Sequence, residues 1–214
     1  MPLLDGLKSH YCKLEILRLG NFISEPLFLS TDACELTLDP NTVHKNISLS
    51  EDCRKACRVK EGRLHPEHPE RFEGHPHAQV LCRESLTGRC YWEAEWEEWC
   101  EIAVAYKGIG RKEKNPDSCG FGSNAMSWSL NCSKYGYSAS HNNKSTEIRI
   151  PTSQRVGVYL DWPGGSLSFY SIHEHHKLKE IHTFRSRFTE PLFAVPGVTH
   201  SGSETLHYSQ VCLI

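Results

Sequence analysis

Cysteine and histidine side chains gather in the first part of the chain, and these are the residue types that bind zinc. Two cysteines, Cys53 and Cys57, precede a Pro-rich segment of histidines. The histidines are His65, His68, His75 and His77. A structural zinc site needs four converging nitrogen or sulfur ligands, and its cysteines are usually paired as Cys-x-x-Cys. The spacing of the two cysteines differs from that pairing, so we predict no metal site.

Four glutamates lie close together and are candidates for the carboxylate pair of a glycosidase. They are Glu93, Glu95, Glu97 and Glu98. However, Glu93 and Glu95 alternate with apolar residues, which is typical of the solvated side of a strand. The sequence also contains no Gly-x-Ser-x-Gly nucleophile motif. We therefore predict a protein without catalytic residues or cofactors, and keep a glycan-binding or glycan-cleaving protein as the alternative.

Charge and hydropathy exclude several classes of partner. The chain has 214 residues, with 24 Lys and Arg against 26 Asp and Glu, and its basic residues are scattered. This balance gives no electrostatic reason to bind nucleic acid or an anionic membrane. No apolar run is long enough to span a bilayer, and the N-terminus lacks a secretory signal pattern. We expect a cytoplasmic protein whose ten cysteines stay reduced.

The strongest structural signal is a β-hairpin between residues 155 and 170. Apolar residues alternate with small or polar ones on both sides of the turn Pro163-Gly164-Gly165. The apolar positions are Val156, Val158, Leu160, Leu167 and Phe169. Proline presets a turn φ and glycine supplies a positive φ, so the two strands can reverse without strain. The hairpin is expected to bury one face, and the rest of the chain must cover it.

Further short strands recur along the chain with turn signals between them. They are expected at 34–42, 47–50, 57–60, 80–82, 91–96, 100–106, 127–130, 135–139, 178–184, 191–195 and 205–208. A His- and Pro-rich segment at 64–78 interrupts them and is expected to be an exposed loop. Four tryptophans are assigned to core or hairpin packing: Trp92, Trp96, Trp128 and Trp162. Because no long helical period appears, the pattern predicts an antiparallel two-sheet β-sandwich.

The first 33 residues have a different pattern. Leu14, Leu17, Leu19 and Phe22 have the spacing of the strand portion of a leucine-rich repeat. A single repeat cannot bury its own apolar face, so the segment is either the end of a longer array or a strand that docks on the main domain. We interpret residues 1–33 as a leucine-rich-repeat remnant and linker, followed by one domain at 34–212.

Six segments of that domain resemble the PRY-SPRY domain family in order and spacing. They read LTLDPNT at 36–42, LSED at 49–52, PERF at 69–72, GRCYWEAE at 88–95, LDWPGGSLSFY at 160–170 and FTEPL at 188–192. The resemblance implies an all-β fold: a bent antiparallel two-sheet β-sandwich, SPRY-like, of the concanavalin-like jelly-roll type. It places PRY at about 34–85 and SPRY at about 86–212. A leucine-rich segment followed by PRY-SPRY also resembles the C-terminus of NOD-like receptors of fish.

The resemblance implies a non-catalytic protein-protein interaction module. Family members bind protein ligands through inter-strand loops, at positions that correspond here to Lys107, Asn131, Ser133 and Tyr135. Exposed aromatic residues often anchor such interfaces, although Tyr135 and Tyr137 are equally well explained as residues of the sandwich itself. The loop at 64–78 is a second candidate surface. PRY-SPRY domains occur in innate-immune receptors, tripartite-motif proteins and pore-forming toxins, so a toxin-like protein is a further alternative. The oligomeric state stays open.

Overall fold

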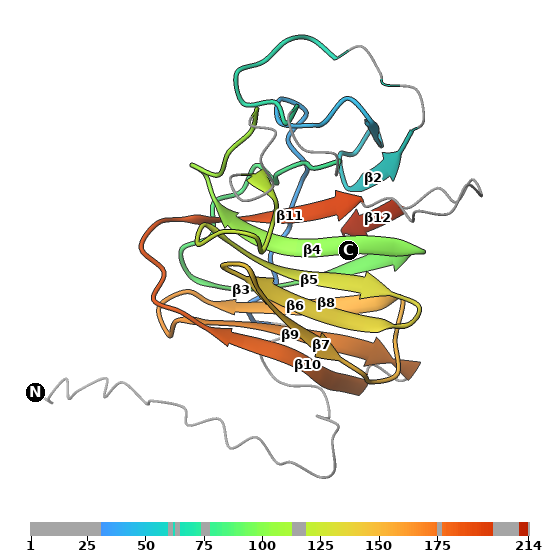
Figure 1. The fold of residues 1–214 in the computed structure, drawn as a ribbon, viewed down its shortest axis with the longest axis vertical. Helices are drawn as coiled ribbons and strands as arrows, with labels where there is room; N and C mark the ends of the chain where they lie inside the picture. Colours follow the sequence, from blue (N-terminus) through green and yellow to red (C-terminus); the bar gives the residue numbers. More distant parts are fainter. Residues whose placement is uncertain are drawn as a thin grey trace, which may run out of the picture.

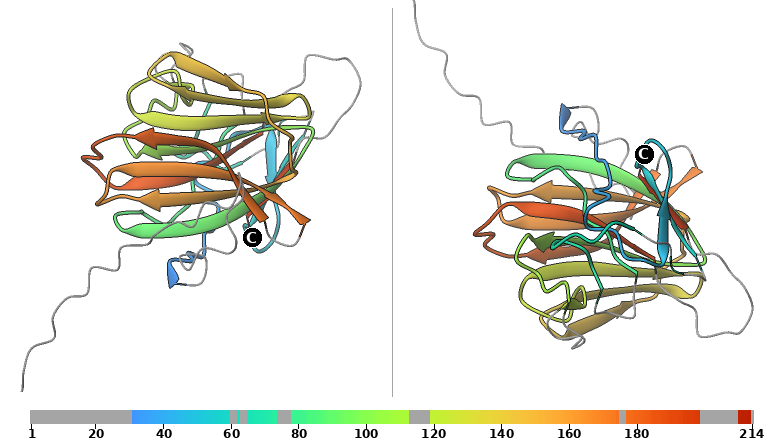
Figure 2. Two further views of the ribbon diagram at one scale, coloured as in Figure 1. Left: turned by 90° about the horizontal axis from the view of Figure 1, so that it is seen from below. Right: turned by 90° about the horizontal axis from the view of Figure 1, so that it is seen from above.

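Two antiparallel sheets stack face to face in the computed structural model (Figures 1 and 2). Alternating apolar side chains of both sheets form the core. The structure describes residues 31–59, 62, 65–73, 78–112, 119–174, 177–198 and 210–213. One sheet has seven strands in the order β1 (Ile47–Leu49), β2 (Lys55–Arg58), β12 (Gln210–Leu213), β3 (Arg89–Glu97), β8 (Arg155–Asp161), β9 (Ser166–His173) and β10 (Lys177–Arg185). The other has five, in the order β11 (Leu192–Val198), β4 (Trp99–Tyr106), β5 (Ser127–Ser133), β6 (Gly136–His141) and β7 (Lys144–Ile148). The predicted antiparallel two-sheet sandwich is confirmed.

The predicted hairpin forms the centre of the seven-stranded sheet as β8 and β9. Val158 lies opposite Phe169 and Leu160 lies opposite Leu167, and all four side chains are fully buried. The Asp161 carboxylate accepts the Gly164 N–H at 2.9 Å, and Gly165 has a φ of 68°. These features provide the tight reversal that the Pro-Gly-Gly sequence predicts.

Aromatic side chains fill the space between the sheets. Trp92 and Trp96 of β3 are buried, as is Trp128 of β5. The Trp128 ring stacks on His141 at 4.5 Å and meets Phe188 edge-on at 5.2 Å. Trp162 is only partly buried in the hairpin turn, where its indole N–H donates to the Glu190 carbonyl at 3.0 Å. The assignment of these tryptophans to core and hairpin packing is confirmed.

A second apolar cluster covers part of the outer face of the five-stranded sheet. Ala103, Ala105 and Val195 point outward from β4 and β11, and side chains from the connecting segments pack over them. These covering residues are Phe72, Leu81, Ile109 and Phe121. The remainder of this outer face, toward Trp99 and the β5–β6 turn, carries polar side chains. The covering cluster therefore divides the face into a closed part and an open part.

Two predicted strands are not regular strands. Segments 34–42 and 80–82 make only isolated bridges, among them Leu38 with Cys82. Leu38 N–H donates to Cys53 O, whereas Asp39 N–H donates to Leu81 O, so successive backbone groups pair with different neighbours. Leu36, Leu38 and Val80 are nevertheless buried, because alternation of apolar residues reports burial and not the partner of the backbone. The expected strand at 205–208 lies outside the described residues.

The prediction that residues 64–78 form an exposed loop is wrong for part of the segment. Phe72 and Arg71 are buried. The Arg71 guanidinium donates to the carbonyls of Pro40, Val43 and Pro66, at 2.6 to 3.3 Å. A buried guanidinium needs such acceptors, and here they fasten the segment to the domain. Residues 74–77 lie outside the described residues.

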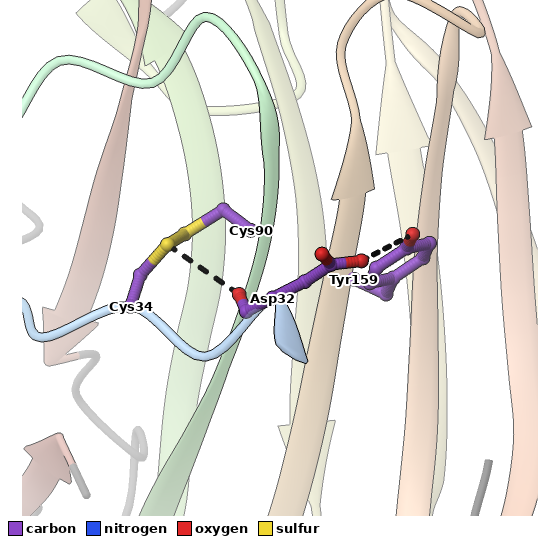
Figure 3. The surroundings of a disulfide bond; sticks show 4 residues. All are labelled: Asp32, Cys34, Cys90 and Tyr159. Carbon is purple, nitrogen blue, oxygen red and sulfur yellow. Dashed lines mark hydrogen bonds between the residues drawn. A yellow bond between two sulfur atoms is a disulfide. The ribbon is translucent and has the colours of Figure 1, made fainter. Parts of the chain in front are cut away.

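A disulfide joins Cys34 to Cys90, with a Cα–Cα distance of 5.6 Å (Figure 3). The expectation that all cysteines stay reduced is wrong for this pair. Ala33 makes a parallel bridge to Tyr91, which brings Cys34 beside the start of β3. In Figure 3 the Asp32 carboxylate also accepts the Tyr159 hydroxyl, at 3.0 Å. The spacing of 56 residues between the two cysteines hides this proximity from the sequence.

Candidate functional site

The outer face of the five-stranded sheet carries three of the four predicted ligand residues. On β5, Trp128, Leu130 and Cys132 point into the core, so the alternation turns Asn131 and Ser133 outward. Tyr135 follows in the turn between β5 and β6. The pairing of the strands aligns Glu101, Asn131, Ser138 and Glu147 in one row across β4, β5, β6 and β7.

The outward side chains of β5, β6 and β7, together with Trp99 and Tyr135, line an open groove of about 500 Å³. Its walls include Trp99, Asn131, Ser133, Tyr135, Ser138 and Glu147. Trp99 and Tyr135 lie side by side, with their ring centroids 6.3 Å apart and the rings tilted by 58°. We call this feature the Trp99–Tyr135 groove.

Local hydrogen bonds hold Tyr135 out toward solvent. The Ser133 hydroxyl accepts the Tyr135 N–H at 3.2 Å and donates to the Gly136 carbonyl at 3.1 Å. Gly136 adopts a φ of 148°, which closes the turn. The Tyr135 side chain is 77% exposed, whereas Tyr137, two residues on, is fully buried. The sandwich interpretation therefore holds for Tyr137 and not for Tyr135.

Lys107 does not belong to the same surface. It follows the far end of β4, and the eight residues of that strand place it roughly 25 Å from Trp99. Its ammonium pairs with the Glu70 carboxylate at 3.1 Å, and its carbonyl accepts the Arg111 guanidinium at 2.9 Å. It thus lies beside the closed part of the face. The structure brings Asn131, Ser133 and Tyr135 together and leaves Lys107 apart.

Sequence reasoning missed Trp99, Ser138 and Glu147 as groove residues. A signal for Trp99 was present, because the alternation that buries Cys100 and Ile102 turns Trp99 outward. No such signal existed for Glu147, which reaches the groove only through the register of β6 with β7.

A buried carboxyl group lies in the same row. Glu101 is 4% exposed, and burial raises its pKa to about 7. Its side chain also approaches Gly197 of β11, where an added Cβ would lie 3.4 Å from the Glu101 Oε2. Among the described residues, no lysine, arginine or histidine forms an ion pair with Glu101.

Glu101→Gln is expected to flatten the pH dependence of stability. Because the folded-state pKa of Glu101 is raised from 4.5 to about 7, its stabilising contribution is complete below pH 4.5 and is lost as the pH rises through 7. The loss corresponds to up to about 3 kcal/mol at pH 8. Urea unfolding between pH 4.5 and 8 should therefore show the wild-type protein losing stability relative to the variant. If the unfolding free energies of the two proteins changed with pH in parallel, the raised pKa of Glu101 would be contradicted.

Two of the candidate glycosidase carboxylates, Glu93 and Glu95, have different surroundings. The Glu93 carboxylate pairs with the Arg155 guanidinium and accepts the Tyr91 hydroxyl at 2.8 Å. Glu95, by contrast, is exposed. Our prediction of a solvated side is therefore right for Glu95 and wrong for Glu93. The reason is that Arg155 of the neighbouring β8 lies opposite Glu95 and reaches back to Glu93.

The candidate zinc ligands lie in different elements. Cys53 sits in the turn before β2 with a φ of 55°, whereas Cys57 lies within β2. The Cys57 thiol lies 3.7 Å from the side-chain carbonyl of Gln210. In the part of the chain that the structure describes, no three His, Cys, Asp or Glu side chains are arranged to hold a metal ion. His75 and His77 lie outside that part.

Two family models match the chain one after the other. The SPRY-associated domain, PRY, matches residues 36–86, and the SPRY domain matches residues 89–210. The chain belongs to the PRY-SPRY family. SPRY domains are protein-interaction modules. The leucine-rich-repeat interpretation of residues 1–33 gains no support from these matches and stays a prediction.

Similar proteins include both toxin subunits and a tripartite-motif protein. Stonustoxin subunit beta from Synanceia horrida is 42% identical over 90% of this chain and 29% of its own length. Neoverrucotoxin subunit alpha from Synanceia verrucosa is 41% identical over 75% of this chain and 23% of its own. Tripartite motif-containing protein 16 from Mus musculus is 35% identical over 76% of this chain and 29% of its own length. The PRY-SPRY chain thus spans about a quarter of the length of these relatives.

Solved structures share the fold. The stonustoxin structure aligns with a TM-score of 0.77 at 33% identity, over 89% of this chain and 32% of that one. The TRIM65 PSpry domain aligns with a TM-score of 0.74 at 24% identity, over 87% of this chain and 93% of that one. Among the described residues, no helix of this PRY-SPRY chain has the length and apolar character needed to span a bilayer.

Proposed function

We propose that this chain is a ligand-recognition domain that binds a protein partner in the Trp99–Tyr135 groove. The observation that carries the proposal is the exposure of Tyr135, at 77%, beside a second aromatic ring and polar side chains. Exposed tyrosine and tryptophan are enriched at the energetic centres of protein interfaces. Membership of the SPRY family supports binding of a protein ligand.

We further propose that the domain is part of an innate-immune protein, of the NOD-like receptor or the tripartite-motif type. Similarity to a tripartite motif-containing protein supports this assignment. A second candidate is a domain of a toxin-like protein, favoured by 38% to 42% identity with several toxin subunits. Sequencing the transcript upstream of Met1 separates the two. Leucine-rich repeats or a tripartite motif would support the first, and a toxin-like region the second.

Tyr135→Ala is expected to lower capture of the protein partner about tenfold or more, since truncating an interface hot spot typically costs about 2 kcal/mol or more and tenfold corresponds to about 1.4 kcal/mol. Lys107→Gln is the matched control, because it changes an exposed residue roughly 25 Å away without placing a second carboxylate beside Glu70. Both variants should keep the wild-type melting temperature. The measurement is quantitative pull-down from cell lysate with each single variant.

Capture that depends on Lys107 and not on Tyr135 would place the binding surface at the closed part of the face instead. Specific retention on a glycan array, with no protein captured, would favour the glycan alternative. In either case the proposed groove would be wrong.

A further inference from the structure

The Trp99–Tyr135 groove has an electrostatic character that its binding partner must match. Its charged wall residue is Glu147, which is exposed on β7. In the described part of the chain, no lysine or arginine pairs with Glu147. Glu101 lies in the same row, three strand spacings or about 14 Å from Glu147. Glu101 is buried and does not line the groove, so the negative charge on the groove wall comes from the exposed Glu147.

The aromatic rings of the groove are also suited to a cation. The face of an aromatic ring attracts ammonium and guanidinium groups within about 6 Å of its centroid. The Lys134 ammonium of the chain itself lies 5.3 Å from the centroid of the Tyr135 ring. A cation thus already rests against this exposed ring, and the adjacent Trp99 ring offers a second surface of the same kind.

We propose that the groove binds a protein segment that presents an arginine or lysine side chain, with the cation held against Trp99 and Tyr135 and attracted by Glu147. The inference rests on the proposed function and names the chemistry of its ligand. An acidic segment would be repelled by the Glu147 carboxylate. A neutral segment would gain the aromatic contacts but nothing from the carboxylate. Lys134 competes for the ring, so its removal should favour an incoming cation.

The first test uses a small probe, N-acetyl-arginine amide, followed by NMR chemical shifts. The matched control is N-acetyl-citrulline amide, which has nearly the same shape and no charge. The Trp99 indole N–H and the Asn131 side-chain amide should shift with the arginine probe and at least about threefold less with citrulline. Glu147→Gln should weaken the arginine response, whereas Lys134→Ala should strengthen it. Equal shifts with both probes, or no change in Glu147→Gln, would overturn the inference.

The second test separates this inference from the proposed function. A displayed peptide library is selected on the wild-type domain and counter-selected on Tyr135→Ala. Tyr135-dependent peptides rich in Arg or Lys, whose affinity falls about tenfold in Glu147→Gln, would support both proposals. Tyr135-dependent peptides without such enrichment would overturn the cation inference and leave the groove as the binding site. Absence of any Tyr135-dependent peptide would overturn both.

Discussion

Trp92→Ala is expected to lower the free energy of unfolding by about 3–5 kcal/mol, the typical effect of emptying a buried tryptophan site. Trp92 is 2% exposed and lies on β3 opposite Val158 of the central hairpin. Its indole belongs to the core cluster formed by both sheets, and close packing keeps the surrounding strands from collapsing fully into the space that it leaves. Urea unfolding followed by circular dichroism measures the difference.

Tyr135→Ala provides the matched control for this loss. It also removes an aromatic ring, but from an exposed turn, and is expected to change stability by less than about 0.5 kcal/mol. Trp92→Phe should retain part of the lost stability, because a smaller ring still fills part of the site. A Trp92→Ala variant as stable as the wild-type protein would show that this face of β3 does not form the core.

Removal of the Cys34–Cys90 disulfide is expected to cost up to about 4 kcal/mol, the chain-entropy value for a closed loop of this length. The two cysteines are 56 residues apart, and the loop between them contains the whole PRY segment. Without the bond, the unfolded chain gains freedom that the folded state does not share. Cys34→Ser is the variant to measure, by urea unfolding under non-reducing conditions.

A reducing agent should destabilise the wild-type protein by the same amount and leave Cys34→Ser unchanged. Cys57→Ser is the matched control, since its thiol is partly buried and unbridged. Should reductant have no effect on the wild-type protein, and Cys34→Ser behave like Cys57→Ser, the two cysteines would be unbridged in solution.

The success of the hairpin prediction and the failure at 34–42 have one physical explanation. In the hairpin, the partner of each strand is the next strand in the sequence, and the Pro-Gly-Gly turn sets their register. At 34–42 the backbone groups pair with Cys53, Leu81 and other distant residues. Burial of Leu36 and Leu38 was predictable from alternation, but the distant backbone partners were not.

In the candidate site too, local side-chain direction was predictable from the sequence, whereas the arrangement of distant residues was not. Alternation along β5 is a local property, and it was sufficient to predict that Asn131 and Ser133 leave the core. The separation of Lys107 from Tyr135 was not predictable, because it follows from the direction in which β4 crosses the sheet. The family resemblance thus grouped residues that the fold places at opposite ends of the five-stranded sheet.

The sequence alone determined the class of fold, the central hairpin, the aromatic core and the family, because each depends on side-chain alternation or on contiguous motifs. The tertiary structure decided which polar residues share a surface. The row from Glu101 to Glu147 exists only through the register of four strands, and the disulfide only through the docking of Ala33 beside Tyr91. Such contacts depend on how distant segments pair, and no short stretch of sequence carries that information.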